Sequence, residues 1–360
     1  MKILIDINHP AHVHYFRNFI KLMEAKGHQF CVINRDSKMI NQLLDYYGIE
    51  HIIRNKRPEK KGTFSSMLNL MRMTLWCIRK SFLFRPDLFL GFASSACAIT
   101  SWLYRKPCVL LDDTEFNSTN HKIYMQFCST VLTPFYFSKK LDDGEKQIYF
   151  HAFIEQLFLH SKYLESNSTI LEEMGLRRGE YVVIRFSAFN AHHDMMANPL
   201  SEDFKKGIVS KIAQKYKVVV SLEQESDDPF YSPFLIKFPP ERMHDIEANA
   251  KFLVTEGITM ASESFILGVP YLLINPLKCG YIDYQIERYP HFFRYSTVEE
   301  VINKSIEEFL AMPFIDTAMH REEVEASTLN PTDFLIWFVE NYPESIRIIK
   351  QNPEYPYKFK

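Results

Sequence analysis

The segment from 252 to 276, FLVTEGITMASESFILGVPYLLINP, constrains the fold more than any other part of the chain. Phe252–Thr255 is an apolar run typical of a strand. Ile258–Leu267 has apolar side chains at helical spacing, and a glycine and a proline follow as a stop signal. Residues 271–275 are apolar up to the final Asn275, as in a parallel strand that is covered on both faces. The order strand, turn, helix, strand predicts a βαβ unit of a parallel α/β sheet.

The turn before this helix is a candidate binding site. It places a helix N-terminus with free backbone N–H groups at the carboxyl end of a parallel strand, where open α/β sheets bind phosphates. Gly257 lies at the turn, and Thr259, Met260, Ser262 and Glu263 follow in the turn and the first helical turn. A carboxylate suits paired sugar hydroxyls better than phosphate, which it would repel. An ordinary βαβ unit with a glycine turn is the alternative.

This stretch resembles the nucleotide-sugar signature of the B-type glycosyltransferase architecture, which the non-hydrolysing UDP-N-acetylglucosamine 2-epimerases share. The resemblance implies an α/β fold of two Rossmann-like, doubly wound parallel-sheet domains that face a cleft. It also implies that Glu263 holds the ribose. The diphosphate would be bound by the backbone of Gly257, Thr259 and Met260, together with Ser262.

Length and composition are those of a globular protein with about two domains. The chain has 360 residues, of which 46% are hydrophobic and 24% charged, and its net charge of -2 gives no reason to expect a nucleic-acid partner. We predict an N-terminal acceptor and catalytic domain over 1–160 and a nucleotide-sugar domain over 161–330. A helix in 331–360 returns towards the first domain. The linker is expected near 155–178, and the tail QNPEYPYKFK has no packing signal.

Cysteine usage and the N-terminus indicate a cytoplasmic protein. The six cysteines occur singly and mostly in apolar runs, which favours buried thiols in a reducing compartment over disulfides or a zinc site. The start MKILIDINHP is too short an apolar run for a signal peptide. No run approaches the roughly 18 apolar residues of a spanning helix.

The first strand ends in NHPAHVH, a loop that holds three histidines and no GxGxxG fingerprint. As metal ligands the histidines are poorly supported, because no carboxylate is near in sequence. One of them is expected to cap the following helix. His12 at the carboxyl end of the first strand suits a general base, because histidine titrates near neutral pH. Asn8 and His9 are predicted substrate contacts.

The opening LIDINHPAHVHYFRNFI resembles a family catalogued as domain of unknown function 354 and described as glycosyltransferase-like. Its members share this start, a PD-hydrophobic-G strand (PDLFLGF here), a DTE sequence after the next strand, and a segment that reads RFSAFNAHHD here. In the 2-epimerases, acids at about the DTE position are catalytic. The resemblance therefore implies acid–base or acceptor-binding roles for Asp113 and Glu115, with a solvated turn as the alternative.

A second polar cluster follows the strand predicted at Tyr181–Phe186. Arg185 at the strand end is expected to pair with the diphosphate, and Asn190 and His193 in the next loop to hold the diphosphate or the sugar. Glu223, which ends the strand at 218–222, is a further predicted substrate contact. A surface loop that merely tolerates polar residues is the alternative.

Residues 54–85 carry nine lysines and arginines against one acidic residue. We favour a helix that covers the sheet and has its cations on the solvent face. The alternative is a helix and basic loop that rest on the inner, anionic face of a membrane, where lipid-linked acceptors reside.

These patterns predict a metal-independent, cofactor-free glycosyltransferase that uses a nucleotide-diphosphate sugar in cell-surface polysaccharide or glycoconjugate biosynthesis. Its acceptor would be a saccharide or a lipid-linked saccharide. A nucleotide-sugar 2-epimerase on the same scaffold is one alternative, and a non-catalytic nucleotide-sugar-binding protein is the other.

Overall fold

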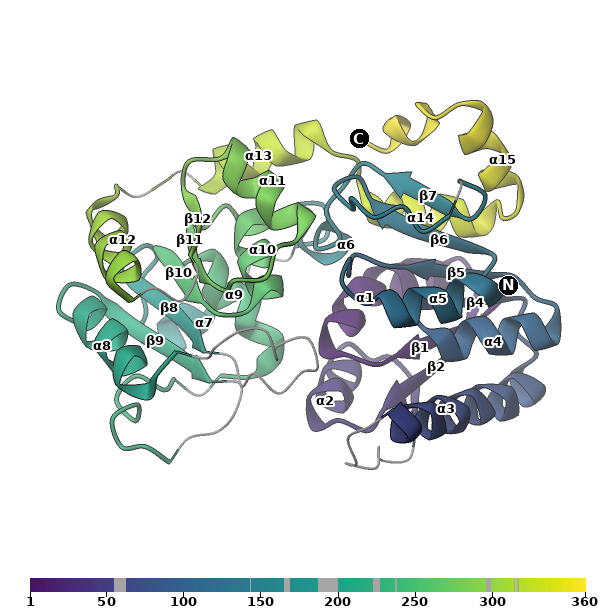
Figure 1. Cartoon of the computed structure of the whole chain (residues 1–360), viewed down its shortest axis with the longest axis horizontal. Helices are drawn as coiled ribbons and strands as arrows, with labels where there is room; N and C mark the ends of the chain where they lie inside the picture. The colour runs from purple at the N-terminus through teal and green to yellow at the C-terminus, as the bar shows by residue number, and fades with distance from the viewer. Residues whose placement is uncertain are drawn as a thin grey trace. The chain divides into compact units, whose positions relative to one another are not determined.

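The computed structural model describes residues 1–54, 63–142, 144–164, 169–186, 200–222, 227–236, 238–295, 299–313, 315 and 317–360. The chain forms two compact units. The first consists of Met1–Tyr163 and Thr328–Lys360, and the second of Leu164–Ser327. Figure 1 shows a sheet covered by helices in each of them. Residues 331–360 thus belong to the same unit as the N-terminal half of the chain.

The first unit is built on a seven-stranded parallel sheet in the order β3-β2-β1-β4-β5-β6-β7. Its strands are β1 Lys2–Ile7, β2 Gln29–Arg35, β3 His51–Arg54, β4 Leu88–Phe92, β5 Cys108–Leu111, β6 Thr130–Pro134 and β7 Gln147–Phe150. Its helices are α1 Pro10–Ala25, α2 Lys38–Tyr46, α3 Thr63–Phe84, α4 Ser95–Tyr104, α5 Ser118–Phe127, α6 Gln156–Leu159, α14 Pro331–Glu340, α15 Glu344–Gln351 and the 3-10 helix η3 Tyr355–Phe359. Apolar side chains on both faces of the central strands force the helices onto both sides.

The second unit contains a five-stranded parallel sheet in the order β12-β11-β10-β8-β9. Its strands are β8 Tyr181–Phe186, β9 Lys217–Leu222, β10 Phe252–Thr255, β11 Tyr271–Ile274 and β12 Phe292–Tyr295. Its helices are α7 Thr169–Glu173, α8 Glu202–Ala213, α9 Met243–Ala248 after a 3-10 turn at Pro240–Arg242, α10 Ile258–Leu267, α11 Gly280–Arg288, α12 Glu299–Ala311 and α13 Thr317–Ser327. Two parallel α/β sheets confirm the predicted fold class.

Gly268 is the stop signal that the sequence indicates at the end of α10. Its φ of 77° lies in the left-handed region, where side chains with a Cβ are strained. A Cβ at this position would lie 2.6 Å from the carbonyl oxygen of Thr317. Only glycine therefore fits this turn without displacing α13.

The linker predicted near 155–178 is wrong in its first part. Glu155 and Gln156 are fully buried in the first unit, and Gln156 Nε2 donates to Thr328 Oγ1 at 2.8 Å. The bond joins residues far apart in sequence, which local composition cannot indicate. The mostly apolar run at 234–238 also predicts a strand, but the residues described there contribute a single bridge between Leu235 and Val220.

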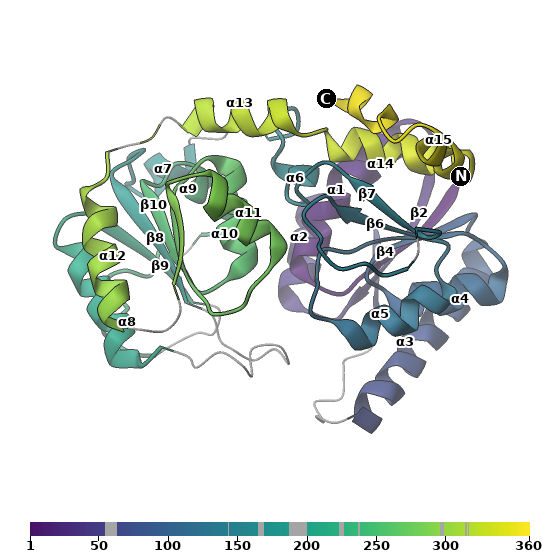
Figure 2. The ribbon, with the colours of Figure 1, turned by 45° about the horizontal axis from the view of Figure 1, so that its top comes forward.

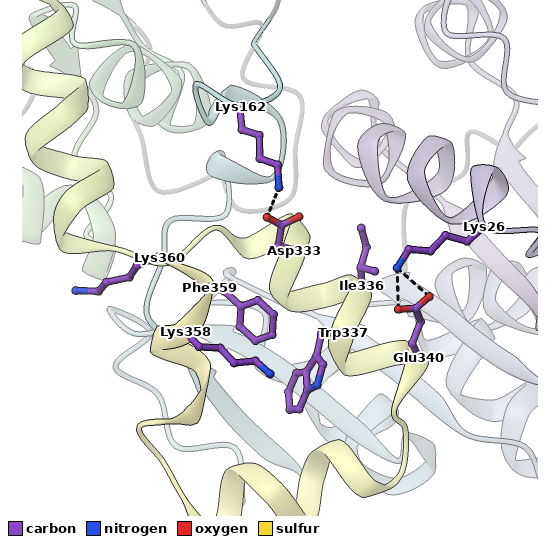
Figure 3. Close-up of a pocket in the computed structure, with 9 residues that line it drawn as sticks. All are labelled: Lys26, Lys162, Asp333, Ile336, Trp337, Glu340, Lys358, Phe359 and Lys360. Atoms are coloured by element: carbon purple, nitrogen blue, oxygen red, sulfur yellow. Dashed lines mark hydrogen bonds and ion pairs between the residues drawn. The ribbon is translucent and has the colours of Figure 1, made fainter.

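The C-terminal tail, whose sequence has no packing signal, packs on the rest of the first unit. The backbone N–H of Asn330 donates to the carbonyl of Phe359 at 2.7 Å, and the Phe359 ring lies 5.5 Å from Trp337. A pocket of about 420 Å³ lies along α14 and is lined in part by the tail (Figure 3). Ion pairs of Lys26 with Glu340 and of Lys162 with Asp333 lie at its wall. None of the predicted site residues lines this pocket.

The six cysteines are free and buried, as predicted. No helix in the described part of the chain is both long and apolar enough to cross a membrane.

Candidate functional site

The carboxyl ends of the central strands of the first unit meet at one edge of the sheet. β1 pairs in parallel with β4, and β4 with β5. The NHPAHVH loop follows β1, and the acidic cluster follows β5, so both lie on this edge, as expected for a parallel sheet. Aromatic rings pack along it, with the centroid of Phe92 4.8 Å from that of His12 and 5.2 Å from that of Tyr15.

A buried polar network fixes the start of the NHPAHVH loop. Asp6 of β1 is fully buried and lies 3.0 Å from Arg54 Nη1. Its second oxygen accepts bonds from Asn8 Nδ2 at 2.8 Å and from the Ser94 hydroxyl at 2.5 Å. Asn8 also accepts a bond from Arg54. The Asn8 side chain is therefore bound within the network, and its predicted role as a substrate contact remains a prediction.

His9 and His12 both have a local structural partner. His9 is the N-cap of α1, and its Nδ1 accepts the N–H of Ala11 at 3.2 Å, as expected for a capping histidine. The backbone N–H of Asn8 donates to His12 Nδ1 at 3.3 Å. Burial, followed by repulsion from His9, lowers the pKa of His12 well below its usual value of 6.5. The ring is therefore neutral at pH 7, with its proton on Nε2.

The side chain of His14, the third histidine of the loop sequence, points into the interior of the first unit. It is buried and stacks on Phe158, and its Nδ1 lies 3.2 Å from Arg17 Nη1. Within the described ranges no group of three or more His, Cys, Asp or Glu side chains has the arrangement of a metal site.

Asp113 is the acid of the DTE sequence whose protonation is most perturbed. The residue is half-buried, and Thr114 Oγ1 donates to its carboxylate at 3.1 Å. Burial, with added repulsion from Asp112, raises the pKa of Asp113 to about 7, and the bond from Thr114 only partly opposes this. Such a carboxyl exchanges a proton near neutral pH, which is the property required of a general acid or base.

The two acids beside it have internal partners. Asp112 is fully buried, and its carboxylate accepts the Tyr124 hydroxyl at 2.6 Å and lies 3.1 Å from His121 Nε2. Glu115 accepts two bonds from Ser138, from the backbone N–H at 2.5 Å and from the hydroxyl at 2.9 Å. Both arrangements order the loop around Asp113.

In the second unit, the N-terminus of α10 lies at the carboxyl end of β10. Gly257 is the N-cap with a φ of -87°, so it is an extended residue that does not require glycine. The N–H of Ala261 bonds to the carbonyl of Gly257 at 3.1 Å and is the first of the helical series. By helix geometry the N–H groups of Ile258, Thr259 and Met260 have no acceptor within the helix. They form the anion-binding end of the helix dipole.

Arg185 borders this turn. It pairs in register with Thr255 at the end of β10 and with Ser221 at the end of β9. The guanidinium is half-buried and donates through Nη1 to the Ser221 hydroxyl at 2.6 Å. The guanidinium is thus held at the β9 side of β8, and its predicted pairing with a diphosphate remains a prediction.

Ser262 and Glu263 lie in the second turn of α10, one turn further in than the sequence suggested. Ser262 is fully buried, and its hydroxyl accepts Gln285 Nε2 at 3.0 Å, which gives that side chain an internal role. Glu263 is 9% exposed, and its carboxylate lies 3.6 Å from His244 Nε2. Of the two, Glu263 has the geometry of a group that binds a ligand.

Two acids and a histidine cluster where α9 meets α10. Glu247 is fully buried near Glu263, and burial, with repulsion from Glu263, raises the pKa of Glu247 well above 4.5. Burial therefore disfavours the ionised form of the Glu247 carboxyl. Neither His244 nor Glu247 is among the residues predicted from the sequence, although their spacing in RMHDIEA puts them on one helix face.

Three predicted site residues, Asn190, His193 and Glu223, lie outside the described residues. Their roles remain predictions.

Asp6 is not predicted from the sequence, because it interrupts an apolar strand by a single residue and its partner Arg54 is distant in sequence.

Comparison with known proteins gives a family and a fold. The model of the family described as "Protein of unknown function (DUF354)" matches residues 1–312. An uncharacterized protein of Methanocaldococcus jannaschii is 20% identical over 359 residues, which cover 95% of this chain and 98% of that protein.

Several solved structures share the fold. UDP-GlcNAc 2-epimerase from Neisseria meningitidis, bound to UDP-GlcNAc, has a TM-score of 0.69 at 12% identity, over 95% of this chain and 100% of that one. UDP-GlcNAc 2-epimerase of Methanocaldococcus jannaschii, in complex with UDP-GlcNAc and UDP, has a TM-score of 0.63 at 14% identity, with coverages of 91% and 99%. A glycotransferase of kitacinnamycin has a TM-score of 0.63 at 12% identity, with coverages of 94% and 98%. At these identities the similarity shows the fold alone, which is the predicted B-type glycosyltransferase architecture.

Proposed function

The chain belongs to the DUF354 family of proteins of unknown function, and we propose that it is a glycosyltransferase that uses a nucleotide-diphosphate sugar. The observation that carries the proposal is the N-terminus of α10 at the carboxyl end of β10, where helix geometry leaves the amides of 258–260 without acceptors within the helix. Arg185 pairs in register with Thr255 just before this turn, and the carboxylate of Glu263 follows in the second turn of the helix. Similar folds bound to UDP-GlcNAc support the same substrate class. The products would be cell-surface polysaccharides or glycoconjugates.

In this proposal the second unit binds the nucleotide. The amides of 258–260 and the guanidinium of Arg185 bind the diphosphate, because both direct N–H donors at negative oxygens. Glu263 accepts hydrogen bonds from the ribose hydroxyls. Its position 3.6 Å from His244 fixes the carboxylate.

The first unit supplies the proton chemistry. Asp113 is the better base, because its pKa of about 7 leaves a large ionised fraction that still accepts a proton readily. Neutral His12 carries its proton on Nε2, so it donates a hydrogen bond to substrate rather than accepting a proton. We therefore transfer the role of base, predicted for His12, to Asp113.

The transfer step follows from these assignments. The carboxylate of Asp113 takes the proton of an acceptor hydroxyl as that oxygen forms a bond to the anomeric carbon. The bond from the anomeric carbon to the diphosphate oxygen breaks, and its electron pair stays on the diphosphate. The helix N-terminus and Arg185 stabilise that charge, so the proposal expects full activity in excess EDTA.

Calorimetry with UDP-, GDP- and CDP-sugars tests the donor class. We expect one donor to bind, and Glu263→Gln to weaken it by about tenfold, the effect of losing one charged hydrogen bond. Glu308→Gln, on an exposed carboxylate of the same unit, is the matched control. Absence of binding by every donor, or unchanged affinity of Glu263→Gln, would contradict the proposal.

A 2-epimerase is the second candidate, and Asp113 favours it too, because a carboxyl that titrates near pH 7 can both remove and return a proton at sugar C2. Incubation of the bound donor in deuterium oxide without an acceptor separates the two reactions. Deuterium at C2 indicates epimerisation, whereas its absence together with acceptor-dependent release of nucleotide indicates transfer. Donor binding without either reaction indicates a non-catalytic binding protein.

The proposal places the enzyme in the cytoplasm, where nucleotide sugars are donors. The six free, buried thiols support a reducing compartment.

A further inference from the structure

Helix α3 has large apolar side chains on its exposed face as well as on its inner face. On its inner face Thr74, Cys77 and Ser81 are buried, and Leu70, Met73 and Phe84 are partly buried against the core. Its exposed face contains large apolar side chains at helical spacing, with Leu75 exposed by 60% and Phe82 by 71%. A surface helix normally buries its apolar side chains. Packing within the unit therefore does not account for the exposed apolar side chains of α3.

The apolar surface extends from α3 to α4. Its members are all large, exposed and apolar: Met67, Leu68, Met71, Leu75, Phe82 and Leu83 of α3 and Trp102 and Leu103 of α4. The two helices are joined by a bond from the Tyr104 hydroxyl to the carbonyl of Ile78 at 3.0 Å. Both figures of the whole chain place α3 beside α4 (Figures 1 and 2). We call these eight side chains the α3–α4 surface.

Cations accompany this surface, and acids are absent from both helices. The α3–α4 segments contain Arg72, Arg79 and Lys80, and Arg85, Arg105 and Lys106 follow their C-termini, whereas neither helix contains Asp or Glu. Lys80 Nζ lies 5.3 Å from the centre of the Trp76 ring. A nearby exposed acid, Asp87, accepts the backbone N–H of Lys2 at 2.8 Å.

We infer that the α3–α4 surface docks the protein onto an anionic lipid bilayer. Large apolar side chains enter the boundary between headgroups and acyl chains, and the surrounding lysines and arginines meet lipid phosphates. The helix lies on the bilayer, consistent with the finding that no described helix is able to span it.

The positive charge around the α3–α4 surface favours an anionic bilayer over a second copy of the chain as its partner. In a twofold contact each patch meets itself, so the six cations would face one another with no acid on either helix to pair with them. An anionic bilayer supplies both the apolar phase and the opposite charge. Membrane docking is separate from the proposed sugar transfer, and vesicle binding is measured without any substrate.

Vesicle sedimentation of the full chain tests the inference. Vesicles of phosphatidylcholine alone are compared with vesicles that contain phosphatidylglycerol, at low and high salt. We expect sedimentation only with the anionic vesicles and its loss at high salt, because screening weakens the electrostatic part. The double variant L75S/F82S should lower the partition coefficient by at least about tenfold.

Matched controls separate the two parts of the surface. R72Q/R79Q should lower anionic binding by about tenfold or more, because each basic residue near the surface contributes attraction. M39S/Y46S removes two exposed apolar side chains of α2 with the same spacing as Leu75 and Phe82, and should bind like the wild type. K21Q/K38Q removes two exposed cations elsewhere on the unit and should also bind like it.

Three results would overturn the inference. The first is equal binding of the wild type to neutral and anionic vesicles, and the second is no sedimentation of the wild type with either kind of vesicle. The third is binding as strong as that of the wild type by both L75S/F82S and R72Q/R79Q. A dimer in light scattering that L75S/F82S converts to monomer would assign the surface to self-association instead. The substituted side chains are exposed, so thermal melting of the variants should match the wild type.

Discussion

Replacing Asp113 by asparagine should stabilise the folded protein and remove its activity. The pKa of Asp113 is about 7 in the folded state, because burial disfavours its charged form and Asp112 repels it, and 3.8 is the ordinary value expected in the unfolded chain. The folded state therefore holds the proton more tightly than the unfolded state. Ionisation of this carboxyl opposes folding.

The sign and the size of the effect follow from these two values. Below pH 3.8 the carboxyl is protonated in both states and has no net effect; as the pH rises towards 7, the wild type progressively loses stability. The two pKa values differ by about three, which corresponds to about 4 kcal/mol at 1.36 kcal/mol for each pKa unit. Because the side chain is only half-buried, screening by water reduces this to about 2 to 4 kcal/mol.

Tryptophan fluorescence during urea unfolding measures this effect on the relevant unit. All three tryptophans, Trp76, Trp102 and Trp337, belong to the first unit, which also contains Asp113. Asp113→Asn should increase the free energy of unfolding far more at pH 8 than at pH 4, and should lower kcat by about 100-fold or more. Asp45→Asn, at a side chain that is 74% exposed, is the matched control.

Equal stabilisation by Asp113→Asn at the two pH values would refute the reasoning. So would a variant that is destabilised at pH 8, or one that is stabilised as expected but keeps full turnover. The last result would retain the electrostatic account and remove Asp113 from the reaction.

Two further predictions concern stability. Gly268→Ala should destabilise the second unit by about 2 to 4 kcal/mol, because the φ of 77° and the Thr317 carbonyl oxygen leave no room for a Cβ. Thermal unfolding followed by circular dichroism measures this loss. Gly207→Ala, with open space around its Cβ position, is the control. Arg54→Met should destabilise the first unit by about 3 to 5 kcal/mol, because it leaves the buried Asp6 carboxylate without its counter-ion. The double variant D6N/R54M should recover most of that loss, and no recovery would contradict the assigned pairing.

The sequence predicts the elements whose signals are local. Ile258–Leu267 is predicted as a helix with the bounds that the structure has, because apolar spacing and the glycine stop are adjacent in the chain. Phe252–Thr255 and Tyr181–Phe186 are likewise strands as predicted. Short apolar runs between turn residues are sufficient for a parallel strand that is buried on both faces.

The sequence does not predict features that depend on distant partners. The tail is polar and rich in proline and aromatic residues, and its packing becomes evident only once Trp337 of α14 is placed against Phe359. The buried bond of Gln156 to Thr328 depends in the same way on the return of the chain to the first unit at Thr328.

For the candidate site, the residue types in the sequence predict where a side chain lies better than they predict what it does. Asp113 and Glu115 both follow β5, but only the environment shows that Glu115 is bound by Ser138 while Asp113 has a pKa of about 7. Similarly, the sequence favours His12 as a base, and only the N–H of Asn8 at its Nδ1 shows which ring nitrogen has the proton.

Hydrogen exchange at the start of α10 tests the central claim most directly. The amides of Ile258, Thr259 and Met260 have no acceptor within the helix, so they should exchange fast in the free protein and slowly with a saturating UDP-, GDP- or CDP-sugar. If a donor binds and these three amides exchange as before, the diphosphate is held elsewhere and the account is wrong.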